Sequence, residues 1–73
     1  MPVRARDLIR ALGAFGVEVS PSRGGSSHWI AEKDGIRYSL PMKRGPTTEL
    51  KDVYVRGACR AFGLDEPALR RKL

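Results

Sequence analysis

The chain has 73 residues and a formal net charge of +6, from 14 Lys and Arg against 8 Asp and Glu. This length fits one small domain, and an apolar fraction of 41% excludes a disordered tail. No apolar run approaches the roughly 20 residues of a membrane span, and charges interrupt the N-terminus before a signal peptide could form. We therefore expect a single cytoplasmic domain over residues 1–73 that binds no membrane and whose partner is a polyanion or an acidic protein.

A single cysteine and a single histidine limit the chemistry that the chain can carry. Cys59 has no partner for an intrachain disulfide, and with His28 it cannot form a zinc site from protein ligands alone. Cys59 lies in a helical apolar pattern, so we interpret it as a small hydrophobic residue rather than a nucleophile. The sequence therefore predicts neither a metal site nor a cofactor.

The first predicted element is a helix over residues 5–15 that ends at Gly16. Its apolar residues recur at helical spacing: Leu8, Ile9, Leu12 and Phe15. Valines then alternate with polar residues over 17–20, which predicts a short strand. A loop rich in Pro, Ser and Gly follows over 21–25.

A β-hairpin is predicted next, because residues 26–33 and 36–41 flank Asp34-Gly35, a strong signal for a two-residue turn. Such a turn also fixes the register. The expected pairs are Lys33–Ile36, Glu32–Arg37, Ala31–Tyr38, Ile30–Ser39, Trp29–Leu40 and His28–Pro41. One face then holds Trp29, Ala31 and Leu40 and is apolar enough to lie under helices. The opposite, open face carries His28, Arg37 and Ser39.

The last third of the chain predicts a second long helix that Thr47 or Thr48 caps and Gly63 ends. Its expected buried stripe contains Leu50, Val53, Tyr54, Gly57, Ala58, Ala61 and Phe62. Asp65 can cap a short final helix. The order α-β-β-β-α predicts an α+β domain with a three-stranded antiparallel sheet, helices on one face and a short extra C-terminal helix.

Cations that are distant in sequence meet at one end of this predicted sheet. In a three-stranded meander, the loop before the second strand and the exit from the third strand lie at the same end. Arg23, Lys43 and Arg44 should therefore converge beside His28, which begins the second strand.

An exposed imidazole among cations suits phosphate chemistry that needs no metal. Neutral His28 can take a proton from a ribose 2′-hydroxyl, and the resulting oxyanion attacks the adjacent phosphate. Arg and Lys side chains stabilise the charge that develops on the phosphate oxygens. The alternative interpretation is structural: His28 is a hydrogen-bonding surface residue, Lys43 and Arg44 lie in a solvated loop, and Gly24-Gly25 supplies positive φ for a turn.

Short motifs along the chain stand in the order and spacing of a known family. A first helix leads to Gly16, and Gly25-Ser26-Ser27-His28 follows. Leu40-Pro41-Met42-Lys43 then precedes a helix that ends in Ala61-Phe62-Gly63-Leu64. Over about residues 6–64 the chain resembles the HicA (YcfA-like) family of small bacterial toxins, whose fold is similar to a double-stranded-RNA-binding domain. Two departures are an added serine in the Gly-Ser-His signature and Lys43, where many members have a second histidine.

The resemblance implies an mRNA interferase, an endoribonuclease that cuts messenger RNA and arrests translation. It makes His28 the catalytic residue, which we assign as general base. The residues expected to contact or shape the RNA site are Arg23, Gly25, Ser27, Arg37, Lys43 and Arg44. A HicB-type antitoxin protein would bind the chain and cover this site, and we expect a monomer when the chain is free.

Two other functions stay open at the level of the sequence. A non-catalytic RNA-binding domain would use the same basic end of the sheet and give His28 no chemistry. A protein-interaction module would dock an acidic partner on its basic surface and bind RNA only non-specifically. RNA cleavage that requires His28 distinguishes the first interpretation from both alternatives.

Overall fold

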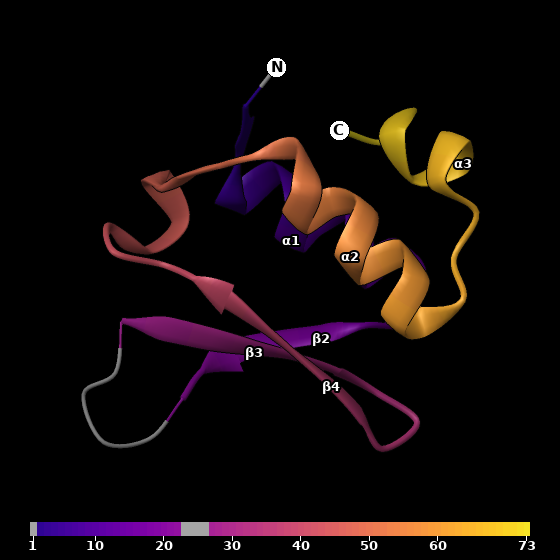
Figure 1. Cartoon of the computed structure of the whole chain (residues 1–73), viewed down its shortest axis with the longest axis horizontal. Coiled ribbons are helices and arrows are strands. Elements are labelled where there is room, and N and C mark those ends of the chain that lie inside the picture. Colours follow the sequence, from indigo (N-terminus) through magenta and orange to yellow (C-terminus); the bar gives the residue numbers. More distant parts are fainter. Residues whose placement is uncertain (1, 23–26) are drawn as a thin grey trace.

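The computed structural model describes residues 2–22 and 27–73, and it places the two long helices on one side of an antiparallel sheet (Figure 1). The sheet consists of β2 (Glu18–Pro21), β3 (His28–Lys33) and β4 (Ile36–Pro41), in that order. The helices are α1 (Ala5–Ala14), α2 (Asp52–Phe62) and the short α3 (Glu66–Arg70). This is the α+β arrangement, α-β-β-β-α with an extra C-terminal helix, that the sequence predicts.

The hairpin between β3 and β4 has the predicted turn and the predicted register. Asp34 and Gly35 both have positive φ, 53° and 80°, as a type I′ turn requires. All six predicted cross-strand pairs are present, from Lys33 opposite Ile36 at the turn to His28 opposite Pro41 at the far end. The dipeptide therefore decides which side chains of the hairpin share a face.

The predicted assignment of the two sheet faces is also confirmed. Ala31 and Leu40 are fully buried beneath the helices, and Trp29 packs partly buried against the same core. On the opposite face, the side chains of His28, Arg37 and Ser39 are exposed. Cys59 is 4% exposed, and burial raises the pKa of its thiol, as expected for a small hydrophobic residue. In the described parts of the chain, no helix has both the length and the apolar character to cross a membrane.

The segment between the sheet and α2 differs from the prediction. Thr47 and Thr48 do not cap α2, which begins at Asp52 with Lys51 at its N-cap. The chain instead makes a 3₁₀ turn, η1 (Gly45–Thr47), and a short strand, β5 (Glu49–Leu50). β5 pairs antiparallel with β1 (Val3–Arg4), and the Ala5 amide donates to the Thr48 carbonyl at 2.7 Å.

Two residues of the predicted helical stripe therefore do not lie on the buried face of α2. Leu50 is buried, at 1% exposure, but its position results from strand pairing rather than from a helix face. Val53 was expected in the core and is instead 62% exposed, because the first turn of α2 presents it to solvent. The register of α2 is thus set by Val55, Ala58 and Phe62, which are buried.

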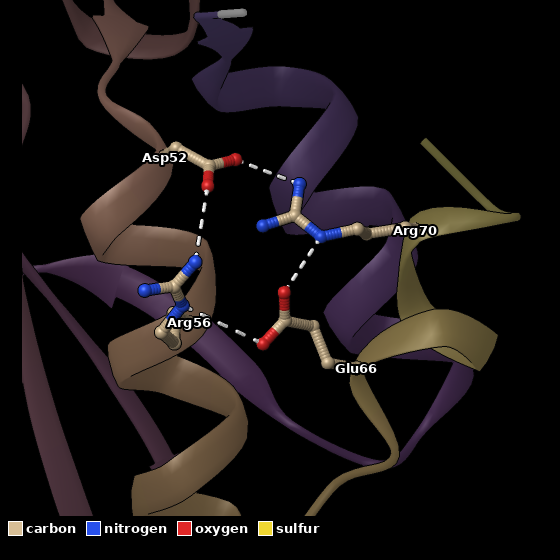
Figure 2. A network of polar contacts seen from close by, with 4 residues as sticks. All are labelled: Asp52, Arg56, Glu66 and Arg70. Carbon is tan, nitrogen blue, oxygen red and sulfur yellow. Dashed lines mark hydrogen bonds and ion pairs between the residues drawn. The ribbon is translucent and has the colours of Figure 1, made fainter.

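The C-terminal helix is held against α2 by one apolar anchor and a network of ion pairs (Figure 2). Leu69 is fully buried. Arg70 contacts Asp52 at 2.7 Å and Glu66 at 2.8 Å, and Arg56 approaches the same two carboxylates at 3.9 Å. The hydrogen bond from Arg70 lowers the pKa of Asp52 below its ordinary value of 3.8.

We expect this network to stabilise the protein less in acid. The variant Asp52→Asn should lose most of this acid dependence of the free energy of unfolding. A carboxylate with a lowered folded-state pKa stabilises the fold above its ordinary pKa, and the stabilisation is lost as the pH falls through the lower value. Urea denaturation at decreasing pH, below about 4, should therefore show a flatter acid dependence for Asp52→Asn than for the parent. Asp65→Asn is the control, because the Asp65 side chain makes no capping hydrogen bond. Equal acid dependence in parent and Asp52→Asn would contradict the assignment.

Candidate nucleic-acid site

His28 is the first residue of β3 and is fixed in place through its backbone. Its carbonyl accepts a hydrogen bond from the Ser22 hydroxyl at 2.8 Å, and across the hairpin it lies opposite Pro41. The Met42 amide donates to the Ser27 carbonyl at 2.6 Å, so the exit of β4 is tied to the residue before His28. Ser27 and His28 are both exposed at this end of the sheet.

The turn after β4 presents two cations beside this end of the sheet. The Arg44 amide donates to the Thr48 hydroxyl, and the Thr47 hydroxyl donates back to the Arg44 carbonyl, each at 2.8 Å. These two bonds close the turn on its own backbone and leave the side chains of Lys43 and Arg44 exposed. A hollow of about 380 Å³ lies between these cations and the threonines.

The turn thus brings Lys43 and Arg44 to the same end of the sheet as His28, as the topology predicts. In Figure 1 the start of β3 and the exit of β4 lie together, with the η1 segment above them. In residues 2–22 and 27–73, neither cation makes an ion pair; those pairs involve Arg10, Arg37, Arg56 and Arg70. Two unneutralised cations near an exposed imidazole favour the binding of a phosphodiester backbone.

Arg37 shares the open face with His28 but lies near the other end of the sheet. It pairs with Glu32, which is four residues along β3 from His28, or about 13 Å at the usual rise of a strand. Its guanidinium also forms an exposed ion pair with Glu32 at 3.7 Å. The structure does not bring Arg37 to His28, and a role for it requires an RNA that extends along the sheet.

The remaining predicted residues fall on the loop between β2 and β3. Arg23 and Gly25 lie outside the described residues, so their predicted roles stay predictions. Ser27 is described, and its carbonyl is used in the bond to Met42. Across the described ranges, no three His, Cys, Asp or Glu side chains gather in a way that could hold a metal ion.

Sequence reasoning missed a second hollow at the same end of the sheet. It has a volume of about 320 Å³, and its lining includes Lys43, Thr48, Lys51 and Tyr54. The sequence predicts Thr48 as a helix cap, which it is not, and Tyr54 as a core residue, which packs partly buried against the core. The available signal was the Glu49-Leu50-Lys51 alternation, which is typical of a strand and places Glu49 and Lys51 on the side opposite the buried Leu50.

Comparison of the chain with protein-family models, curated proteins and solved structures finds no match.

Proposed function

We propose that this chain is a metal-independent endoribonuclease of the HicA type, with a fold similar to a double-stranded-RNA-binding domain. One observation carries the proposal: the only imidazole of the chain is exposed at the end of the sheet where Lys43 and Arg44 are also exposed. The Gly-Ser-Ser-His motif and the order of the later motifs support the same conclusion.

In this proposal His28 takes the proton from a ribose 2′-hydroxyl, and the 2′-oxygen attacks the neighbouring phosphorus. The bond from phosphorus to the 5′-oxygen breaks, which leaves a 2′,3′-cyclic phosphate and a free 5′-hydroxyl. Lys43 and Arg44 stabilise the charge on the phosphate oxygens, since cations placed where charge develops lower the barrier. The leaving 5′-oxygen takes its proton from water or from the imidazolium of His28.

The cellular role that goes with this chemistry is that of a toxin that cuts messenger RNA. A HicB-type antitoxin would then cover the end of the sheet that holds His28 and Lys43. An acidic surface on that antitoxin would suit the net charge of +6.

The proposal is tested by incubating the purified protein with a long single-stranded RNA in the presence of EDTA. We expect cutting, with 2′,3′-cyclic phosphate ends on the products. The same sequence with 2′-O-methyl riboses should stay intact, because it lacks the attacking hydroxyl. Cutting of the methylated RNA, or cutting only after divalent metal is added, would contradict the mechanism.

A non-catalytic RNA-binding domain is the second candidate, and Lys43 is the observation that favours it. The site contains one imidazole, and Lys43 stands at the position where a second one is found in many relatives of the HicA type. A domain of this kind binds both the natural and the methylated RNA and cuts neither.

A further inference from the structure

The hollow behind Lys43 continues the surface that begins at His28. Pro41 lies opposite His28 in the hairpin and also lines the 320 Å³ hollow, together with Lys43 and Lys51. The neighbouring 380 Å³ hollow shares Lys43 and Thr48 with it. The two hollows therefore adjoin, and together we call them the η1 groove; their lining residues run from the end of β4, past η1, to the start of α2.

The charges of the η1 groove favour an anion. Lys43, Arg44 and Lys51 are exposed in its lining, and none of them makes an ion pair within the described ranges. Glu49 is the one carboxylate in the lining, and it leaves the groove with a net charge of about +2. By contrast, Arg56 of α2 and Arg70 of α3 form ion pairs with Asp52 and Glu66.

The groove also offers polar groups that a nucleic-acid backbone can use. Thr48 lines it with a hydroxyl that accepts from the Arg44 amide and keeps its own proton to donate, and the partly buried Tyr54 lines it while packing on the core. A tyrosine held by the core is a rigid surface for a ribose or a base, because little side-chain freedom is lost on contact. A basic groove that also carries an aromatic side chain is typical of proteins that bind a single-stranded backbone.

We infer that the η1 groove binds the backbone of single-stranded RNA as it leaves the cleaved phosphate at Lys43, with Lys51 on a phosphate further along the groove. This inference rests on the function proposed above and extends the RNA site from the sheet to the start of α2. Lys51 becomes a binding residue that the motif resemblance does not include.

The test compares Lys51→Gln with Lys72→Gln, which removes the same charge from an exposed residue near the C-terminus, outside the groove lining. The probe is a short fluorescein-labelled single-stranded RNA with 2′-O-methyl riboses, which the protein cannot cut. We expect Lys51→Gln to bind more weakly and to have a dependence of log Kd on log salt that is shallower by about 0.7, the value of one phosphate contact. Lys72→Gln should keep the parent slope.

The outcomes separate this inference from the proposed function. If Lys51→Gln and Lys72→Gln weaken RNA binding equally, only the total charge of the protein matters. The inference that the η1 groove binds RNA would then be wrong. Cutting of natural RNA with parental affinity by Lys51→Gln would also overturn the groove while leaving the nuclease intact. If RNA binding depends on Lys51 but the protein cuts no RNA, the groove is supported as an RNA-binding surface and the proposed nuclease activity is wrong.

Discussion

Gly57→Ala is expected to destabilise the protein by about 1 kcal/mol or more, because overpacking typically costs about 1–3 kcal/mol. Gly57 lies inside α2, where the Tyr38 ring of β4 packs directly on it. A Cβ at this position would overlap the Tyr38 hydroxyl and lie 2.7 Å from its Cζ atom. Tyr38 is half-buried, and burial is the main cause that raises its pKa. The ring must therefore shift to admit the methyl group, and the shift disturbs its packing against the core.

Gly13→Ala gives the control, because it is the same substitution inside the other long helix. A Cβ at Gly13 would meet nothing within 4 Å, so the change should stabilise the protein by about 0.5–1 kcal/mol through helix propensity. Urea denaturation should give a lower free energy of unfolding for Gly57→Ala than for the parent, and a higher one for Gly13→Ala. In a double-mutant cycle, Tyr38→Phe should reduce the cost of Gly57→Ala, since the hydroxyl makes the closest contact. Stabilisation by Gly57→Ala would show that α2 does not rest on Tyr38.

The hairpin could be predicted in full because its determinants are local. Asp34-Gly35 selects a two-residue turn, and the turn decides which of His28 and Trp29 faces the helices. The first helix follows in the same way from apolar spacing and Gly16. The Asp34-Gly35 turn, six residues along the chain, therefore fixes the register that places His28 on the open face at the basic end of the sheet.

The segment from Gly45 to Lys51 could not be predicted because its structure depends on the other end of the chain. β5 pairs with β1 over only two residues on each side, Val3–Arg4 and Glu49–Leu50. In strands this short the alternation of polar and apolar residues is too brief to predict a strand by itself, and each strand's partner is more than forty residues away in the sequence. The η1 groove lies on this segment, which is why the sequence alone does not assign Lys51 and Thr48 to the proposed site, although it does assign Lys43 and Arg44.

His28→Ala should reduce RNA cutting by about 10²–10⁴-fold, which is the usual contribution of a general base. The side chain is exposed at the end of a strand and is not part of the core, so the free energy of unfolding should stay positive and the variant should fold. Single-turnover cutting of RNA in EDTA measures the first quantity, and urea denaturation followed by circular dichroism measures the second. Loss of the fold in His28→Ala would assign the imidazole a structural role instead.

Added imidazole separates proton transfer from positioning in the same variant. If His28 acts as the base, free imidazole that enters the space left by His28→Ala should restore part of the cutting, and the restored rate should rise with the concentration of the neutral form. A residue that only orients the loop between β2 and β3 would not be replaced in this way, because free imidazole is not attached to the strand. Restored cutting would therefore place the base at the start of β3, whereas lost cutting without rescue would leave the role of His28 as one of positioning.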